Sequence, residues 1–292
     1  MQDKVLISPK ELASMLENES VVVIDTRSPD DYATSHIPGA VNIHDIFTHF
    51  AFSSSEGIET LHTMFSDLFG AAGLSGEETA VIYEHTMNKG YGQSCRGFFL
   101  LKYLGYPKVA VLHGGKKAWD IEGFPTTSEF PTPQTKSFPL KVDPSILVTT
   151  EEMLRSLNNP FVFKLDVRDY EEWSGITASP QDMIFCPRKG RIPNSVWIEW
   201  QRMMVQEDDG IPLFRSKEEI LEICSQVGIK PESTVYIYCL AGIRASNTYI
   251  ALKEAGILDV RVYLGSWFEW SRDPELPIEQ KESNSSRMIA QI

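Results

Sequence analysis

The sequence lacks the features of an exported, membrane-spanning or zinc-stabilised protein. No basic segment followed by an apolar one stands near Met1, so we expect no signal peptide. No run of about 18 apolar residues occurs, which argues against a membrane-spanning helix. The cysteines show no CxxC spacing, which argues against a structural zinc site or a disulfide framework. We therefore expect a protein of the reducing cytoplasm.

Positive charge is also scarce. The formal net charge is −13, from 27 Lys and Arg against 40 Asp and Glu. This balance disfavours nucleic acid or an anionic membrane as a partner, because both repel an acidic protein. Gly114-Gly115 is followed by no GxGxxG or Walker spacing, so it predicts a turn and not a nucleotide loop. No cluster of His, Cys and Asp predicts a metal, and we expect no cofactor.

What is present is the composition of an ordinary globular protein, with 42% hydrophobic and 23% charged residues. The 292 residues suffice for about two domains. Short apolar runs alternate with helical patterns, the runs at 21–24, 81–83 and 109–112 and the helices at 96–104 and 247–255. This alternation predicts an α/β fold with a mainly parallel sheet in each half, flanked by helices on both faces.

The chain also repeats itself. Four segments of the first half return in the second half in the same order. The matched pairs are 21–27 with 161–168, 36–41 with 191–196, 79–84 with 234–239, and 109–119 with 260–270. The first pair ends in Asp-x-Arg, and in each half a Ser or Thr opens a short helix before it. Four ordered matches predict two similar domains.

Composition also suggests where the domains meet. We expect a first domain over residues 1–126, a linker over 127–144, a second domain over 145–280 and a flexible tail over 281–292. The linker prediction rests on a proline-rich stretch between 125 and 144, which suits an extended segment lying over the surface. The tail is polar and aperiodic.

Cys239 is the residue that says most about chemistry. It follows a β-branched and aromatic run, 234–238, and precedes a small-residue segment that leads into a helical pattern from Asn247. Unpaired amides at a helix N-terminus create a positive field that favours thiolate, the nucleophilic form of cysteine. Gly242 suits the tight loop because it tolerates backbone angles closed to other residues. The amides of 240–244 are then expected to surround the sulfur.

With these motifs together, the chain resembles the rhodanese superfamily in its tandem two-domain form, which includes thiosulfate and 3-mercaptopyruvate sulfurtransferases. The resemblance covers about Ile7 to Pro277. Its pieces are the two Asp-x-Arg motifs, His36-Ile37-Pro38-Gly39-Ala40, Cys-x-x-Gly at 239–242 and Gly265-Ser266-Trp267-Phe268-Glu269-Trp270. It implies an active second domain and an inactive first copy, in which Glu84 stands at the position of Cys239.

The resemblance implies a transferase that takes a sulfane sulfur from a donor such as thiosulfate onto Cys239 as a persulfide and passes it to cyanide or a thiol. The loop matches neither subtype of the family. Leu240 and Ala241 are neutral where thiosulfate enzymes carry two basic residues, and Ala241 lacks the serine hydroxyl of mercaptopyruvate enzymes. The alternatives are therefore a 3-mercaptopyruvate enzyme or a persulfide carrier that docks a protein donor or acceptor and has little small-molecule turnover. A non-catalytic regulatory domain is disfavoured because Cys239 is present in the second copy.

The expected active-site loop consists of Cys239, Leu240, Ala241, Gly242, Ile243 and Arg244. Arg244 either faces the cleft and holds the donor or pairs with an acid such as Asp166. The residues with a possible supporting role, for each of which a structural role competes, are Asp166, His36 and Trp267.

Relatives often carry a donor-binding arginine at the position of Glu172. The basic residues at 188–191 either replace it or form a solvated loop. Cys224 lies on an apolar helical face and is expected in the core. The interpretation as a whole requires that Cys239 is reachable from a pocket between the two domains, and a sealed thiol would contradict it.

Overall fold

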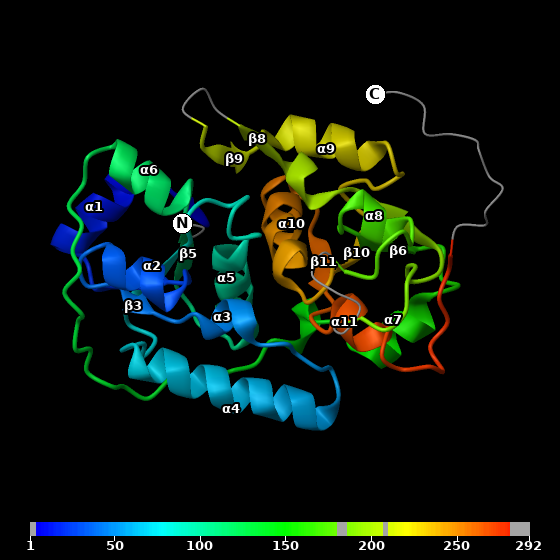
Figure 1. The fold of residues 1–292 in the computed structure, drawn as a ribbon, viewed down its shortest axis with the longest axis horizontal. Coiled ribbons are helices and arrows are strands. Elements are labelled where there is room, and N and C mark those ends of the chain that lie inside the picture. Colours follow the sequence, from blue (N-terminus) through cyan, green and yellow to red (C-terminus); the bar gives the residue numbers. More distant parts are fainter. Residues whose placement is uncertain (1–3, 180–185, 207–209, 281–292) are drawn as a thin grey trace.

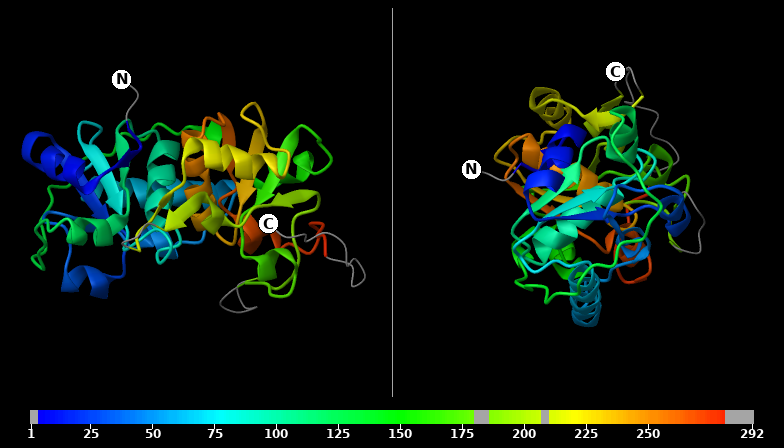
Figure 2. Two further views of the ribbon diagram at one scale, coloured as in Figure 1. Left: turned by 90° about the horizontal axis from the view of Figure 1, so that it is seen from above. Right: turned by 90° about the vertical axis from the view of Figure 1, so that its left-hand side faces the viewer.

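A computed structural model describes residues 4–179, 186–206 and 210–280 and contains two α/β units side by side (Figure 1). Viewed from above, the first half of the chain forms one end of an elongated molecule and the second half forms the other (Figure 2). Within the described ranges, no helix combines the length and apolar character needed to cross a bilayer.

The first unit is built on a five-stranded parallel sheet in the order β1-β5-β4-β2-β3. Its elements are β1 (Leu6–Ile7), α1 (Pro9–Asn18), β2 (Val21–Asp25), α2 (Pro29–Thr34), β3 (Val41–Asn42), α3 (Asp45–Thr48), α4 (Ser55–Ala71), β4 (Thr79–Tyr83), α5 (Gln93–Tyr103), β5 (Val109–Leu112) and α6 (Gly115–Ile121). The central strands are short apolar runs because helices cover both of their faces.

The second unit repeats this plan with a four-stranded parallel sheet in the order β11-β10-β6-β7. Its elements are η1 (Pro144–Ile146), α7 (Thr150–Ser156), β6 (Val162–Asp166), α8 (Tyr170–Trp173), β7 (Ser195–Trp197), η2 (Trp200–Met203), β8 (Met204–Gln206), β9 (Pro212–Phe214), α9 (Lys217–Ser225), β10 (Thr234–Tyr238), α10 (Ile243–Glu254), β11 (Asp259–Val262) and α11 (Ser266–Trp270). A single parallel bridge from Leu147 to Val262 takes the place that β1 holds beside β5. The predicted fold class is confirmed.

Helix starts in the two units are encoded in the same way. Ser8 caps α1 and Thr149 caps α7, each in a reciprocal capping box with a glutamate three residues on. A box of this kind satisfies two backbone amides that the helix leaves free, and each cap contributes about 1 kcal/mol. The Ser and Thr that open the repeats therefore define where the first helices begin.

Alternate residues of each strand face opposite layers. In the first unit Val81 belongs to the core cluster that contains Trp119 of α6, whereas its neighbour Ile82 belongs to the cluster that contains Phe65 of α4. In the second unit Val235 and the helices α9 and α10 share the core that contains Ile82, so the two units meet through one continuous hydrophobic layer.

Helices α5 and α10 lie side by side at the centre of this layer (Figure 1). The Phe99 and Tyr249 rings pack edge to face with centroids 5.2 Å apart, a contact worth about 1 kcal/mol beyond the buried area. The Asn247 side-chain amide of α10 donates to Cys95 Sγ of α5 at 3.8 Å. The pairing brings the N-terminal ends of α5 and α10 together.

The proline-rich segment before η1 runs along the outer side of the first unit (Figure 1). The Lys136 amide donates to the Gly70 carbonyl at 2.9 Å and the Lys141 amide to the Leu104 carbonyl at 2.9 Å. Phe138 stacks on Tyr106 with centroids 5.5 Å apart. The domain limits stay predictions, and the predicted tail 281–292 lies outside the described residues.

Candidate active site

Cys239 directly follows β10, and α10 begins at Ile243. The predicted helix start at Asn247 is therefore too late, and Ile243 and Arg244 belong to the first helical turn and not to a loop. The cause is Gly242, whose φ of +82° turns the chain into the helix. A Cβ at this position would lie 2.7 Å from Leu264 Cδ2, so both the backbone angle and the space require glycine, as the sequence predicts.

The sulfur of Cys239 lies at the N-terminal end of α10. Its Sγ accepts the Gly242 N–H at 3.1 Å. Among the described contacts, Gly242 is the only residue of 240–244 whose amide donates to the sulfur, so fewer amides surround the sulfur than the sequence predicts. We call this arrangement, in which a side chain at a strand end accepts amides from the start of the next helix, the cradle. The positive end of α10 adds to the effect of the Gly242 amide and favours a negative sulfur.

Cys239 is buried, with 1% of its surface exposed. The expectation of a thiol open to solvent between the two units is therefore wrong for this structure. The physical reason is that the α5–α10 interface places Cys239 in the hydrophobic core that both units share. Sulfur transfer through Cys239 is compatible with this buried position only if the side chains over the sulfur move.

Arg244 is held by carboxylates of the second unit. Its guanidinium donates to Glu172 at 2.6 and 3.0 Å and lies 3.1 Å from Asp169. Burial works against its charge, but the Glu172 carboxylate outweighs burial and raises the pKa of Arg244. Pairing with an acid is thus the alternative that the structure places here, but Asp166 is the wrong partner. Sequence reasoning missed this pair. The signal for it was an acidic residue, Glu172, at a position where relatives often carry arginine.

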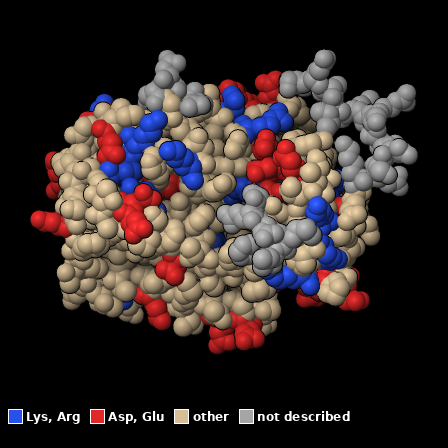
Figure 3. All heavy atoms as spheres, in the orientation of Figure 1, with Lys and Arg blue, Asp and Glu red and all other residues tan. Residues whose placement is uncertain are grey.

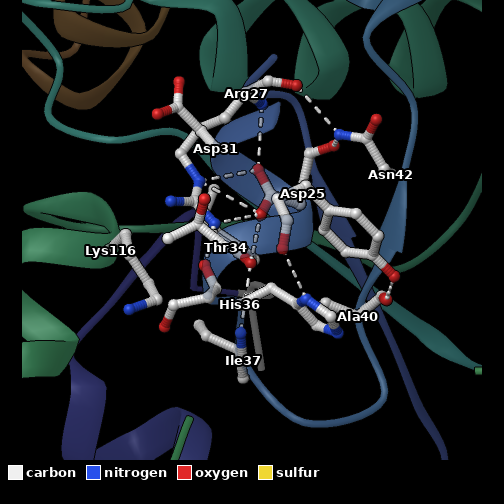
Figure 4. Close-up of polar contacts among 12 residues, drawn as sticks. Asp25, Arg27, Asp31, Thr34, His36, Ile37, Ala40, Asn42 and Lys116 are labelled. Atoms are coloured by element: carbon white, nitrogen blue, oxygen red, sulfur yellow. Dashed lines mark hydrogen bonds and ion pairs between the residues drawn. The ribbon is translucent and has the colours of Figure 1, made fainter. Parts of the chain in front are cut away.

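Asp166 is unavailable because it binds Arg168. The two side chains meet at 3.0 Å (Nε to Oδ1) and 2.6 Å (Nη2 to Oδ2), and Arg168 Nη2 also donates to the Gly190 carbonyl at 2.8 Å. The same fork joins Arg27 to Asp25 in the first unit at 3.0 and 2.6 Å (Figure 4). The Asp-x-Arg motif therefore ties a strand end to a neighbouring loop in both units.

His36 lies in the first unit, close to the Asp25–Arg27 pair (Figure 4). Its Nδ1 is 2.7 Å from the Tyr32 carbonyl and its Nε2 is 3.1 Å from the Glu129 carbonyl. Its ring stacks on Tyr32 with centroids 3.9 Å apart. These contacts occupy both ring nitrogens, and no described contact joins His36 to the Cys239 loop.

Trp267 contacts Cys239 through its backbone. The Trp267 N–H donates to the Cys239 carbonyl at 3.0 Å. Its buried ring lies 4.6 Å from the Arg168 guanidinium, and its Nε1 donates to the Arg188 carbonyl at 3.1 Å. Trp267 therefore supports the floor beneath the Cys239 loop.

The basic residues at 188–191 are neither a donor site nor a solvated loop. Arg188 donates to the carbonyls of Trp270, Ser271 and Leu276 at 2.7 to 2.8 Å. Arg191 pairs with Glu279 and lies over the Trp173 ring. The cations fasten the chain beyond α11 to the second unit, and both sequence interpretations are corrected.

Ser266 is a site residue that sequence reasoning missed. Its hydroxyl accepts the Cys239 N–H at 3.1 Å and donates to the Tyr263 carbonyl at 2.6 Å. Its φ is +52°, and the matching residue of the first unit is Gly115, with φ +65°. A side chain at positive φ costs about 1 kcal/mol or more. A serine where the other copy has glycine was therefore a signal that the hydroxyl is used.

The first unit contains the same cradle with a different occupant. Glu84 follows β4 as Cys239 follows β10, and its carboxylate accepts the amides of Gly92 and Ser94 at 3.3 Å each. Gly92 precedes α5 with φ +82°, the value of Gly242. Burial raises the pKa of Glu84 to about 8, although the hydrogen bonds to Ser94 work the other way.

The pockets found among the described residues are not lined by Cys239. On the face drawn in Figure 3, acidic and basic side chains are interspersed. A groove of about 1020 Å³ between the units is lined by residues that include Phe52, Glu151 and Arg272, and it does not include Cys239. In the described part of the chain, no group of three or more His, Cys, Asp and Glu side chains is placed to hold a metal ion.

Comparison with protein families gives two matches to one model. Residues 8–122 and 149–273 each match the rhodanese-like domain. Among curated proteins, the chain is 28% identical over 274 residues to a thiosulfate sulfurtransferase of Pseudomonas aeruginosa, with 94% of this chain and 96% of that protein covered. A thiosulfate sulfurtransferase of Azotobacter vinelandii is 27% identical with the same coverage.

Solved structures show the same fold at similar identity. A complex of an EanB variant with ergothioneine superposes with a TM-score of 0.81 at 25% identity, covering 94% of this chain and 70% of that chain. The anaerobic ergothioneine biosynthesis enzyme of Chlorobium limicola, bound to trimethyl histidine, has a TM-score of 0.80 at 25% identity and the same coverage.

Proposed function

Because the chain belongs to the rhodanese family, with a rhodanese-like domain in each half, we propose that it is a sulfurtransferase whose working thiol is Cys239. The observation that carries the proposal is the pair of cradles. In the second unit a thiol accepts the Gly242 amide at the N-terminus of α10, whereas in the first unit a carboxylate of the chain itself takes that place. We place the activity in the cytoplasm, where a thiol stays reduced.

The proposed reaction has two displacements on sulfur. The Cys239 thiolate attacks the outer sulfur of a donor such as thiosulfate, a new S–S bond forms, and the donor's S–S bond breaks as sulfite leaves with the electron pair. A thiol, as its thiolate, or cyanide then attacks the outer sulfur of the persulfide and returns Cys239 as a thiolate. The intermediate is covalent, so kinetics of the ping-pong type are expected.

The charges around the Cys239 loop indicate which kind of sulfur donor fits the site. Leu240 and Ala241 are uncharged, and the charge of Arg244 is taken up by Glu172 and Asp169. A dianion such as thiosulfate finds no cation in this loop with spare charge. A sulfur donor with one negative charge, such as a thiol persulfide, fits this site with a smaller desolvation cost. Mercaptopyruvate remains a candidate, without a hydroxyl at Ala241 to assist.

The experiment that tests the function is sulfur uptake. The purified chain is treated with thiosulfate, 3-mercaptopyruvate or a low-molecular-weight thiol persulfide, and its peptides are analysed by mass spectrometry. We expect the gain of one sulfur atom on the peptide that contains Cys239. The Cys239→Ser variant should gain none, and Cys224→Ser, a buried cysteine of α9, is the matched control that keeps the gain. No adduct with any donor contradicts the proposal.

A persulfide carrier is the second candidate, and the burial of Cys239 favours it. A protein partner that docks at the junction of the units can move the side chains over the sulfur, whereas a small donor has less binding energy to do so. Transfer rates from a small donor and from a protein persulfide, such as that of a cysteine desulfurase, separate the two. Faster transfer from the protein supports the carrier.

A further inference from the structure

Ser53 of the first unit is hydrogen-bonded across the interface to the second unit. It lies in the segment between α3 and α4, which passes α11 (Figure 1). Its N–H donates to Glu269 Oε1 of α11 at 2.8 Å, and its hydroxyl donates to Glu269 Oε2 at 2.9 Å. The same hydroxyl accepts the Thr150 N–H at 2.8 Å and lies 2.9 Å from Thr150 Oγ1. One serine therefore connects the first unit to both α7 and α11.

Two rings of the same segment also hold α11. Phe50 and Phe52 pack on the Phe268 ring with centroids 4.4 and 5.4 Å apart. Aromatic contacts of this kind add to the energy of the buried area. Phe268 is buried, whereas Ser53 and Glu269 are half-buried and line the groove between the units. The segment 50–53 therefore fixes α11 by an apolar contact that is shielded and by a polar contact at the wall of the groove.

Helix α11 in turn holds the backbone of the Cys239 loop. The Trp267 N–H donates to the Cys239 carbonyl at 3.0 Å. The Phe268 N–H donates to the Leu240 carbonyl at 2.8 Å. At the start of the helix, the Ser266 hydroxyl accepts the Cys239 N–H at 3.1 Å. Both backbone polar groups of Cys239 are bound by α11, so a displacement of α11 also displaces Cys239.

A second path from Ser53 to Cys239 leads through Thr150. The Thr150 Oγ1 lies 2.7 Å from the Tyr263 hydroxyl, and the Tyr263 carbonyl accepts the Ser266 hydroxyl at 2.6 Å. Tyr263 and Ser266 are fully buried. Buried hydrogen-bonding groups favour one arrangement, because a partner left unpaired there is costly. Ser53 therefore stands where two sets of contacts converge on the Cys239 loop.

We propose that Ser53, a residue of the unit that lacks the nucleophile, is a positioning residue for Cys239. Through Glu269 it fixes α11, and through α11 it keeps the Cys239 loop in its closed position. Loss of the Ser53 hydroxyl leaves the Glu269 carboxylate with the Ser53 N–H alone, so α11 separates from the first unit more often. The inference deepens the proposed function and rests on it for the claim that the opened thiol takes up sulfur.

The test is the rate at which iodoacetamide alkylates Cys239, measured by mass spectrometry against Cys224 of the same chain. Cys224 is also buried in the second unit, so its alkylation reports general opening. We expect Ser53→Ala to raise the Cys239 rate about tenfold, because a hydrogen bond to a charged group is lost. The Cys224 rate should change by less than about twofold, since the opening is local. Ser53→Thr keeps the hydroxyl and should restore the slow Cys239 rate.

Ser8 provides the matched control. Its N–H and its hydroxyl each donate to Glu11 Oε2 at 2.8 Å, so it makes the same kind of contact as Ser53, but at the start of α1. Ser8→Ala should leave the ratio of Cys239 to Cys224 alkylation unchanged. An equal rise of this ratio in Ser8→Ala and Ser53→Ala overturns the inference, and so does the absence of a rise in Ser53→Ala.

Glu269→Gln tests the contact from the side of α11. Glutamine keeps an acceptor oxygen but has no charge, so its hydrogen bonds to Ser53 are weaker and the Cys239 rate should rise here as well. If Ser53 and Glu269 act together, the double variant should exceed the faster single variant by less than about twofold. Single-variant effects that multiply in the double variant contradict the inference.

Sulfur uptake tells a failure of the inference from a failure of the function. Uptake on Cys239 with an unchanged alkylation ratio in Ser53→Ala removes Ser53 from the account and keeps the sulfurtransferase. A raised ratio with no uptake from any donor keeps Ser53 as the residue that controls access to the thiol and removes sulfur transfer.

Discussion

Glu84 in the first unit and Cys239 in the second occupy the same place in the fold. Each follows the central strand of its sheet and stands before a helix that opens with a glycine at φ +82°. They differ in the chain that follows, since residues 85–91 separate Glu84 from Gly92 but only residues 240 and 241 separate Cys239 from Gly242. The longer loop gives the carboxylate room to fold back onto the helix amides.

The comparison shows that the same backbone arrangement can hold two different side chains with different chemical properties. The Glu84 carboxylate accepts hydrogen bonds from Gly92 and Ser94, so the cradle is filled. The Cys239 sulfur accepts a hydrogen bond from the Gly242 N–H, and no second amide donates to it among the described contacts. Burial raises the pKa of Glu84 to about 8, so the first unit places an uncharged carboxyl group at the helix terminus near pH 7, whereas the second unit places a thiol there.

The largest expected effect is on sulfur transfer. Cys239→Ser should reduce the rate of thiocyanate formation from thiosulfate and cyanide by about a thousandfold or more, because a serine hydroxyl is not ionised near pH 7 and makes no persulfide. Glu84→Gln in the other cradle should change this rate by less than about twofold. Similar losses in the two variants would mean that the first cradle takes part in the chemistry.

The next effect is on stability and comes from Glu84. With a pKa of about 8 when folded and an ordinary value of 4.5 when unfolded, the side chain keeps its proton in the folded chain while the unfolded chain loses it. Stability should therefore fall as pH rises from about 4.5 to 8, by up to about 1.4 kcal/mol per unit. Urea unfolding of Glu84→Gln should show a flatter pH profile. Equal slopes in the two chains would show that the raised pKa is absent.

The next prediction compares the buried partners of two matching positions. Two residues after the helix-opening glycine, the second unit has Arg244, which pairs with Glu172, and the first unit has Ser94, which binds Glu84. Glu172→Gln leaves the buried Arg244 with Asp169 alone and should lower the free energy of unfolding by about 3 kcal/mol. Ser94→Ala removes a hydroxyl that binds Glu84 and should cost about 1 kcal/mol. Chemical denaturation measures both. The reverse order would contradict the assignment of the buried ion pair.

Variants of the two helix-opening glycines should have smaller effects than Glu172→Gln. Gly242→Ala and Gly92→Ala place a Cβ 2.7 Å from Leu264 and 2.6 Å from Asn247, at positive φ in both cases, and each should lower stability by about 2 kcal/mol. Gly123→Ala, with φ +74° and open space, should cost about 1 kcal/mol. Among the two cradle variants, we expect only Gly242→Ala to slow sulfur transfer as well. Equal transfer rates would show that the Gly242 amide contributes nothing.

The architecture could be predicted from the sequence because periodic apolar runs mark the strands and ordered repeats mark the two units. The strand runs at 109–112 and 234–238 appear in the structure as β5 and β10 with the predicted bounds. The need for glycine at 242 was also predictable, since a strand end, a tight loop and a helix start require a positive φ there. Local signals of this kind depend on neighbours in the sequence.

The charge pairs and the burial of the thiol depend on contacts between distant segments. Arg244 and Glu172 meet only after α8 and α10 pack. The helix start was misplaced because Ile243 and Arg244 have no distinctive helical pattern when read alone. The closed position of Cys239 follows from the shared core, which no single repeat encodes.

The position of Glu84 also determines what would be needed to make the first unit reactive. A side chain held against helix amides by its own backbone is tethered there, so a free ligand would have to displace it at a high effective concentration. Putting a thiol back at position 84 would leave the long return loop in place, and revival of the silent copy would also require that loop to be shortened.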